Sequence, residues 1–242
     1  MHPNINIFQD INKLSENFSV RLMEMVDEAF HSKKIFNLLL SGGKTPLIIY
    51  DYLSENFLKK MKWDVIHFFW GDERCVPSDY SESNFGQASK HLFKKIPISL
   101  ANMHPIVGEN HPYLEADRYS TLLHKHFNVI NEIPEFDLII LGVGDDGHIA
   151  SVFPSQLDIF NSNRLYEVTS HPQTGQQRIT ATGKLINNSS NIFFIATGEK
   201  KAEIVKQILN KENGYRNLPA ALVLPSLGNI EWFLDNDAAS LL

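Results

Sequence analysis

Short apolar segments alternate with longer segments of helical character along most of this chain. This alternation constrains the fold more than any other feature, because strands separated by helices usually pair in parallel. The expected strands are residues 35–40, 65–70, 137–143, 165–169, 192–197 and 221–224. The expected helices are residues 17–31, 46–58, 83–92, 112–127 and 200–209, with a final turn near Ala238. We therefore predict an α/β fold with a mostly parallel sheet flanked by helices.

Length and composition exclude several classes of function. The chain has 242 residues, of which 43% are hydrophobic and 21% charged, and no linker is evident, so we expect one domain over residues 1–242. A net charge of −6, without a block of Lys and Arg, argues against nucleic acid as a partner. No apolar run approaches the roughly 20 residues that span a bilayer, so we expect no membrane association.

Two further features bear on where the chain works. Cys75 is the single cysteine, which excludes an internal disulfide and suits a reducing cytosol. The N-terminus lacks a basic region followed by an apolar core, so we expect no signal peptide. We predict a cytoplasmic protein that is a monomer or a weak homodimer.

The expected sheet also predicts where a ligand binds. Ligands of parallel sheets usually lie beyond the carboxyl ends of the strands. The loops after residues 40, 70, 143, 170 and 197 should therefore lie near one another, and each carries glycine or polar residues.

The first of these loops, residues 41–46, predicts a phosphate site. Thr45 can cap the helix that follows, and Pro46 suits its first position. Free N–H groups at a helix start attract an anion, and Lys44 adds a cation. A nucleotide P-loop is disfavoured because its motif requires glycine where Leu38 stands. A capping turn without a ligand is the alternative.

The second loop, residues 71–77, places three charged residues directly after a buried strand. Arg74 can bind a phosphate, a carboxylate or a developing oxyanion, and Asp72 can orient a sugar hydroxyl. A solvated loop with a local Asp–Arg pair is the alternative. Cys75 beside Arg74 is better explained as an inert thiol than as a reactive one.

The third loop belongs to residues 141–154, where a buried strand runs into a glycine-rich turn with two aspartates and a histidine. Asp146 lies two residues from His148, and this pair is a plausible oriented general base. The glycines also match the dinucleotide-binding fingerprint. The two acids oppose a pyrophosphate there, and Pro154 follows too soon for a long helix. A purely structural histidine is the other alternative.

Later segments add two cations, and several well-known motifs are missing. Arg178 follows a predicted strand, and Lys201 stands at the start of a predicted helix, where a lysine can contact phosphate. His124 and His126 are two apart on a predicted helix and do not share a face. No short zinc-binding spacing such as His-Glu-x-x-His is present. A serine-hydrolase elbow is also lacking.

Taken together, these loops resemble the 6-phosphogluconolactonase family, within a wider group that includes glucosamine-6-phosphate isomerase. The matching segments are residues 41–46, 71–77, 83–84, 144–154, 178–180, 198–202 and 218–220, with Trp232, Asp235, Ala238 and Ala239 in the tail. They span nearly the whole chain in the right order. The resemblance implies a Rossmann-like fold, similar to that of glucosamine-6-phosphate isomerase, and no metal or organic cofactor.

The resemblance also implies a reaction, the hydrolysis of 6-phospho-D-glucono-1,5-lactone to 6-phosphogluconate in the pentose phosphate pathway. His148 then takes a proton from water, and Asp146 orients its imidazole. Arg74 either stabilises the oxyanion or holds the substrate. The residues expected to bind substrate or its phosphate are Gly42, Gly43, Lys44, Thr45, Asp72, Arg178 and Lys201.

The isomerase branch is the alternative, as a sugar-phosphate isomerase or deaminase that acts on an amino-sugar 6-phosphate. That branch carries a ring-opening glutamate five residues after the histidine, and typically a tyrosine in place of Arg74. This chain has Phe153 at the first position, which cannot move a proton. Both differences favour the lactonase. A non-catalytic sugar-phosphate sensor is a third reading, which the intact acid–histidine pair disfavours. Lys44 stands where the family commonly has a small residue, and it either strengthens phosphate binding or points to solvent.

Overall fold

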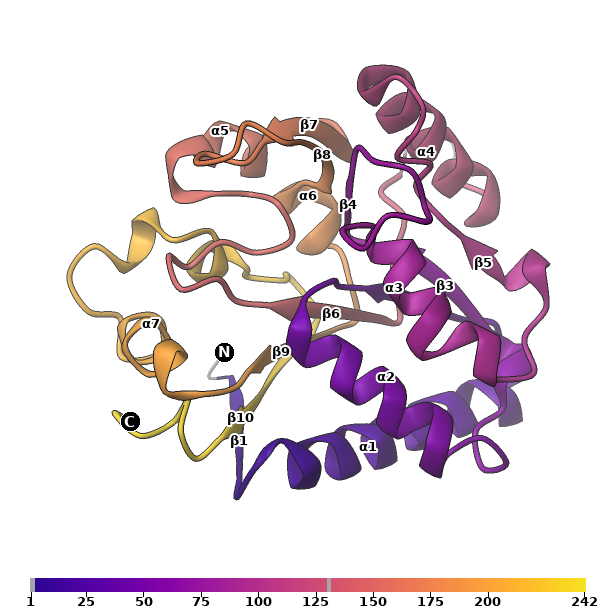
Figure 1. Cartoon of the computed structure of the whole chain (residues 1–242), viewed down its shortest axis with the longest axis horizontal. Helices are drawn as coiled ribbons and strands as arrows, with labels where there is room; N and C mark the ends of the chain where they lie inside the picture. Colours follow the sequence, from indigo (N-terminus) through magenta and orange to yellow (C-terminus); the bar gives the residue numbers. More distant parts are fainter. Residues whose placement is uncertain (1–2, 130–131) are drawn as a thin grey trace.

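The computed structural model describes residues 3–129 and 132–242, and its centre is a parallel sheet of seven strands (Figure 1). The strands are β1 (Asn4–Phe8), β2 (Phe36–Leu40), β3 (Ile66–Trp70), β5 (Met103–His104), β6 (Leu138–Gly142), β9 (Asn191–Ala196) and β10 (Asn229–Asp235). Their order across the sheet is β1-β10-β9-β6-β2-β3-β5, and every neighbouring pair is parallel. The predicted α/β fold with a mostly parallel sheet is confirmed.

A second, antiparallel sheet corrects the expected role of residues 165–169. It consists of β4 (Asp72–Arg74), β8 (Gln177–Ala181) and β7 (Tyr166–Ser170), in that order. The short turn between β7 and β8 is closed by hydrogen bonds between His171 and Gln176 and between Gly175 and His171. Strands joined by so short a turn pair antiparallel. The loop after residue 170 therefore closes a hairpin, and does not end a parallel strand.

The predicted helical segments match the α-helices well in their central residues and less well at their first and last residues. These helices are α1 (Ile11–His31), α2 (Lys44–Asn56), α3 (Asn84–His91), α4 (Pro112–His126), α5 (Leu157–Phe160), α6 (Gly183–Ile186) and α7 (Ala202–Leu209). Helix α1 begins six residues before the predicted start, because Asp10 caps it by accepting the N–H groups of Asn12 and Lys13 at 2.9 Å. Within the described residues, no helix combines the length and apolarity needed to cross a membrane.

The C-terminal part of the chain departs most from the predicted elements. The expected strand at residues 221–224 is wrong, because Pro219–Leu222 forms a 3₁₀ turn that the proline begins. The strand that completes the sheet here is β10, and it pairs with β1 at the sheet edge. Neither β1 nor β10 was expected from the apolar runs. The expected turn near Ala238 is present after β10.

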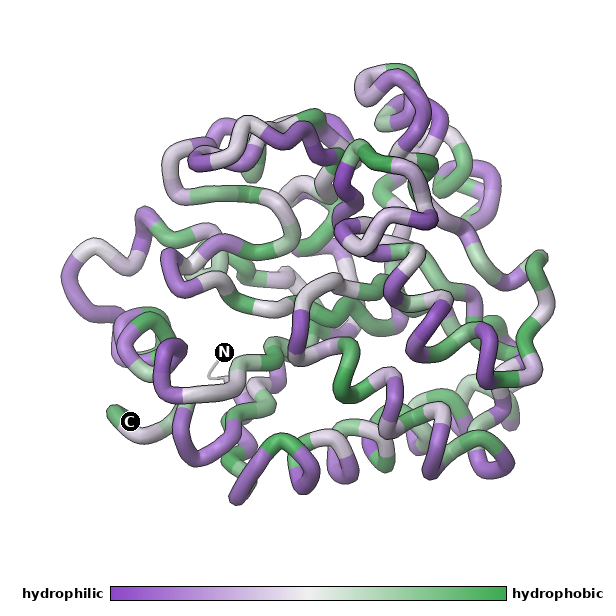
Figure 2. Tube along the Cα trace, viewed as in Figure 1, coloured by the Kyte–Doolittle hydropathy of each residue, from purple (hydrophilic) through white to green (hydrophobic). Residues whose placement is uncertain are grey.

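Side chains on successive residues of β3 point to opposite faces of the sheet. Phe68 packs against Phe93, with ring centroids 5.0 Å apart, on the side where α3 lies. The next residue, Phe69, points the other way and packs against His126 at the end of α4. Figure 2 shows the same layering, with hydrophobic residues concentrated in the central strands and hydrophilic ones on the outer turns of the helices. The core therefore extends over both sheet faces, and polar groups collect at the strand ends.

Candidate active site

A pocket of about 700 Å³ opens at the carboxyl ends of β2, β3, β6 and β9. Its lining includes Gly42, Gly43, Lys44, Thr45, Asp72, Arg74, Gly144, Asp145, His148, Arg178, Thr197 and Lys201. All residues predicted for the site line this pocket except Asp146, which touches His148 from outside it. Residues that lie far apart in the sequence thus share one site, as the strand-end rule predicts.

The loop after β2 provides the start of a helix that faces the pocket. Gly43 precedes α2 with a φ of +103°, a left-handed conformation that favours glycine. Thr45 was expected to cap α2, but the helix already begins at Lys44, and the Thr45 hydroxyl instead hydrogen-bonds to the Thr197 hydroxyl at 2.8 Å. Because Gly43 supplies no capping side chain, the first N–H groups of α2 remain suited to an anion.

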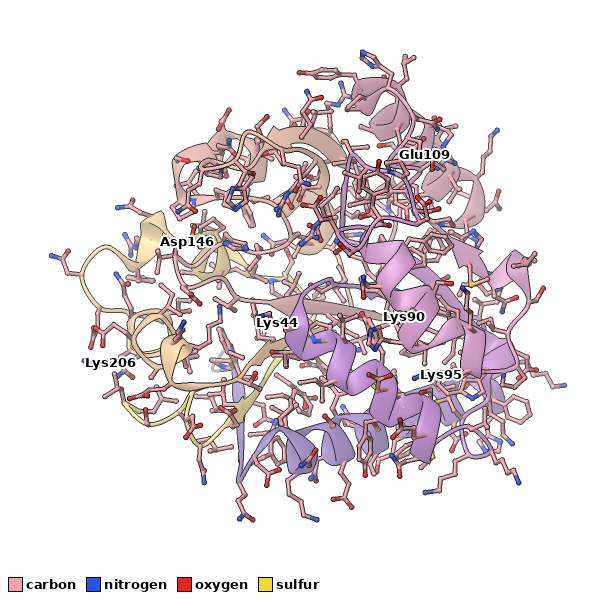
Figure 3. The ribbon with its side chains drawn as sticks, in the orientation of Figure 1. Lys44, Lys90, Lys95, Glu109, Asp146 and Lys206 are labelled. Carbon is pink, nitrogen blue, oxygen red and sulfur yellow. The ribbon has the colours of Figure 1, made fainter. Side chains whose placement is uncertain are left out.

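The turn after β9 lies opposite this helix start and contributes a lysine. The Gly198 N–H donates to the Asp235 carboxylate at 2.9 Å, which holds the turn against the end of β10. Lys201 pairs with Asp145 of the loop after β6. Its ammonium group therefore reaches across the pocket between two loops. Figure 3 labels Lys44 at the start of α2 and Asp146 in the loop after β6, on the two sides of this opening.

Two arginines stand side by side on the antiparallel sheet. Arg74 of β4 and Arg178 of β8 are direct partners in the strand register. Arg178 donates through Nη1 to the Ser151 hydroxyl at 3.3 Å, and Arg74 donates to the Glu82 carbonyl. The Nε atoms of both arginines are buried and have no hydrogen-bond partner within residues 3–129 and 132–242. Burial and the charge of Arg74 lower the pKa of Arg178. An anion between the two guanidinium groups would offset their repulsion and accept hydrogen bonds from the unpartnered Nε atoms.

The loop after β6 holds an oriented imidazole. The Nδ1 atom of His148 donates to Asp146 Oδ1 at 2.6 Å, which places the remaining lone pair on Nε2. Burial opposes the ionisation of Asp146, but the hydrogen bond and charge of His148 outweigh it and lower the pKa of that carboxyl group. A Cβ atom on Gly144 would lie 2.0 Å from His148 Nδ1, so only glycine fits there. The predicted acid–histidine pair is therefore assembled in the structure.

Phe153 packs against this imidazole and links it to the arginines. The Phe153 side chain is fully buried, and its ring centroid lies 4.8 Å from that of His148. The Arg178 guanidinium lies over the same Phe153 ring, 5.9 Å from its centroid. The sequence indicates only that Phe153 cannot transfer a proton. The structure adds that its ring contacts both the His148 imidazole and the Arg178 guanidinium.

The hydrogen bonds of the second loop decide between the two interpretations of Asp72. Asp72 is 4% exposed and accepts from the Ser151 hydroxyl at 2.6 Å and from Asn84 Nδ2 at 3.2 Å. It forms no ion pair with Arg74 among the described residues, so the solvated Asp–Arg pair is wrong. Burial raises the pKa of the Cys75 thiol to about 11, as expected for an inert cysteine.

Glu73 supports the site from outside the pocket lining, and the sequence assigned it no role. Its buried carboxylate accepts from the backbone N–H groups of Arg74, Asn84 and Phe85, at 2.8, 2.7 and 2.8 Å, and from the Ser83 hydroxyl at 3.1 Å. It therefore ties Arg74 to the start of α3. Burial raises the Glu73 pKa to about 7. The available signal was an acidic residue directly behind an apolar strand, which is costly to bury without partners.

Comparisons with known proteins agree with this geometry. A family model described as glucosamine-6-phosphate isomerases/6-phosphogluconolactonase matches residues 9–232. A protein of Aggregatibacter actinomycetemcomitans named 6-phosphogluconolactonase is 41% identical over 207 residues, which cover 85% of this chain and 87% of that one. One of Synechocystis with the same name is 33% identical, with 98% of each chain covered.

A solved structure extends the likeness to three dimensions. The crystal structure of 6-phosphogluconolactonase from Thermotoga maritima superimposes with a TM-score of 0.83 at 28% identity, over 96% of this chain and 99% of that one. The matched residues include the loops at 41–46 and 141–154 and the two pocket arginines, Arg74 and Arg178. The chain therefore belongs to the family of glucosamine-6-phosphate isomerases and 6-phosphogluconolactonases.

Proposed function

We propose that this chain hydrolyses 6-phospho-D-glucono-1,5-lactone to 6-phospho-D-gluconate, the second step of the oxidative pentose phosphate pathway. The observation that carries the proposal is the Asp146–His148 pair in one pocket with two half-buried arginines, whose Nε atoms are buried and unpartnered among the described residues. Relatives at up to 41% identity carry the name of this activity. We propose one catalytic domain over residues 1–242, working as a monomer or weak homodimer in the cytoplasm, consistent with its single cysteine.

His148 acts as the general base in this reaction. Its Nε2 atom takes a proton from water while the water oxygen bonds to the lactone carbonyl carbon, and the carbonyl oxygen becomes an oxyanion. The intermediate then collapses, the bond between the carbonyl carbon and the ring oxygen breaks, and His148 returns the proton to that oxygen. Asp146 keeps the proton on Nδ1 throughout and stabilises the transient imidazolium.

The charges around the pocket divide into two tasks. The 6-phosphate binds to the helix start at Gly43, Lys44 and Thr45, with Arg178 and Lys201 closing around it. Arg74 faces the reacting carbonyl and stabilises its oxyanion. Binding of the remote phosphate thereby fixes the lactone ring against the attacking water.

Two further residues support these tasks, the buried Asp72 and the closely packed Gly42. Asp72 holds the Ser151 hydroxyl, which in turn accepts a hydrogen bond from Arg178, and its position in the lining lets it orient a sugar hydroxyl. Gly42 lies so close to Asn84 that a Cβ atom would stand 1.9 Å from the Asn84 amide oxygen. The phosphate loop is thus seated directly on α3.

A coupled assay of 6-phosphogluconate formation, corrected for spontaneous opening of the lactone, tests the proposal. We expect enzyme-dependent hydrolysis of the phosphorylated lactone and no release of ammonia from glucosamine 6-phosphate. Ammonia release without lactonase activity would instead support the isomerase branch. Tight binding of the sugar phosphate with neither activity would support a sensor and overturn the proposed reaction.

A further inference from the structure

Three histidines from distant parts of the chain meet on the face of the sheet that α4 covers. His67 lies on β3, His104 on β5 and His126 at the end of α4. One ring nitrogen from each lies within 4.8 Å of the other two, and the distance between His67 Nδ1 and His104 Nε2 is 3.0 Å. None of these three residues lines the active-site pocket. We propose that this histidine cluster (His67, His104 and His126) binds a transition-metal ion such as Zn²⁺.

The spacing of the His67 and His104 nitrogen atoms suits such an ion, and a small turn of the His126 ring would bring its nitrogen, now within 4.8 Å of the other two, into the same coordination sphere. With Zn–N bonds of about 2.0–2.1 Å, a tetrahedral site separates its ligand nitrogens by roughly 3.3 Å. The His67–His104 pair is within a few tenths of an ångström of that separation. One of these two nitrogens carries a proton in the metal-free protein. That ring adopts its other tautomer when the metal binds, so the ligand set remains three neutral imidazoles.

The donor set of the cluster consists of imidazoles alone. Imidazole donors without a carboxylate suit zinc, copper and nickel, and do not suit magnesium or calcium.

One ring is further held by a residue outside the cluster. The Nε2 atom of His126 donates to the Asn37 amide oxygen at 2.7 Å, which leaves a lone pair on Nδ1. Metal-binding histidines usually donate their second nitrogen to an oxygen in this way. The backbone at His104 is fixed as well, because the Tyr119 hydroxyl donates to its carbonyl at 2.7 Å.

A separate surface pocket gives an ion access to the cluster. It has a volume of about 560 Å³, and its lining includes His104, His126, Thr121, Arg118 and Lys125. Glu115 pairs with Arg118 and offsets part of the positive charge at this entrance, while Lys125 is exposed to solvent. Three protein ligands and an open side leave a fourth position for water, as in zinc sites that keep one coordination position open.

Titration of chelator-treated protein with Zn²⁺ by calorimetry tests the proposal. We expect one equivalent to bind, with His104→Gln and His126→Gln each weakening the affinity by more than 100-fold. Asn37→Ala should weaken it by about 10- to 100-fold, the usual effect of losing a group that orients a ligand. His111→Gln alters an exposed histidine outside the cluster and should leave the affinity unchanged.

The same titration followed by nitrogen NMR of the histidine rings keeps the test independent of how the variants fold. We expect saturating Zn²⁺ to shift the signals of His67, His104 and His126 in the unmodified protein. Failure to bind stoichiometrically, or unchanged signals from these rings, would overturn the proposal. So would binding that disappears in His148→Gln, because the metal would then lie in the active-site pocket. Lactonase activity of the cluster variants reports separately on the proposed reaction.

Discussion

Histidines occupy two regions of this molecule in opposite environments. His148 lies in a glycine-rich loop at the pocket, about one-third exposed, with the Asp146 carboxylate 2.6 Å from its Nδ1 atom. The histidine cluster lies against the sheet, and its rings contact one another and Phe69. A carboxylate partner favours a transient imidazolium, as a base requires, whereas partial burial among other imidazoles and an aromatic ring favours neutral rings. The neighbours of an imidazole, more than its presence, therefore indicate which chemistry it can perform.

Replacing the histidine in each region should separate them most clearly. In the proposed reaction, His148→Gln removes the general base, so we expect kcat for the phosphorylated lactone to fall by about 10²- to 10⁴-fold. His104→Gln is the matched control and should retain nearly all activity. Steady-state kinetics of both variants, with circular dichroism to confirm folding, check this. Near-normal turnover in His148→Gln would refute its assignment as the base.

The arginines sharpen the contrast because they give the active site a charge that the histidine cluster lacks. Arg178→Ala should lower kcat/KM for the phosphorylated lactone by about 10- to 100-fold, since hydrogen bonds to charged groups contribute about 1.5–3 kcal/mol. Hydrolysis of unphosphorylated gluconolactone should change much less. Competition between the two lactones measures the effect directly. An undiminished preference for the phosphorylated form would remove Arg178 from the phosphate site.

Asp146→Asn tests whether the carboxylate itself distinguishes the two regions. An asparagine amide can donate to Nδ1, which moves the imidazole proton to Nε2 and occupies the atom that must accept a proton. We expect kcat to fall about 10-fold, because this side chain is half exposed and water can partly restore the tautomer. Nitrogen NMR of His148 would report the tautomer change. A lower kcat with an unchanged tautomer would assign Asp146 a different role.

The sequence predicts the active site better than the histidine cluster for a physical reason. The pocket is built from glycine-rich loops at strand ends, where each loop carries its own recognisable residues, and parallel strands bring such loops together. His67, His104 and His126 stand on separate elements, and the first two are 37 positions apart in the chain. No short spacing marks them, so the sequence-based expectation of no metal could not take them into account.

Other differences between the sequence-based predictions and the structure also have local causes. Strands β1 and β10 pair at a sheet edge, where Asn4, Asn6 and Glu231 interrupt the apolar pattern that identifies central strands. Thr45 is a good capping residue, but a tertiary contact with Thr197 takes its hydroxyl. Packing of Phe153 on His148 depends on how the chain turns after residue 148, and periodicity does not encode that turn.

The smallest expected effect concerns stability, and it tests the cluster without its metal. The pKa of His104 is about 4 in the folded chain but near 6.5 when unfolded. As the pH falls, the unfolded chain takes up a proton on this ring before the folded chain does. The neutral ring therefore contributes its full share to the free energy of unfolding above pH 6.5, and that share is lost as the pH falls towards 4. Urea unfolding of chelator-treated protein measures this effect. Between pH 7 and pH 5, His104→Gln should lose about 1 kcal/mol less of its free energy of unfolding than the unmodified protein, after allowance for the partial exposure of the ring. His111→Gln should show the full loss. Identical pH dependence in both variants would mean that His104 titrates normally and that partial burial among other imidazoles does not distinguish the cluster from His148.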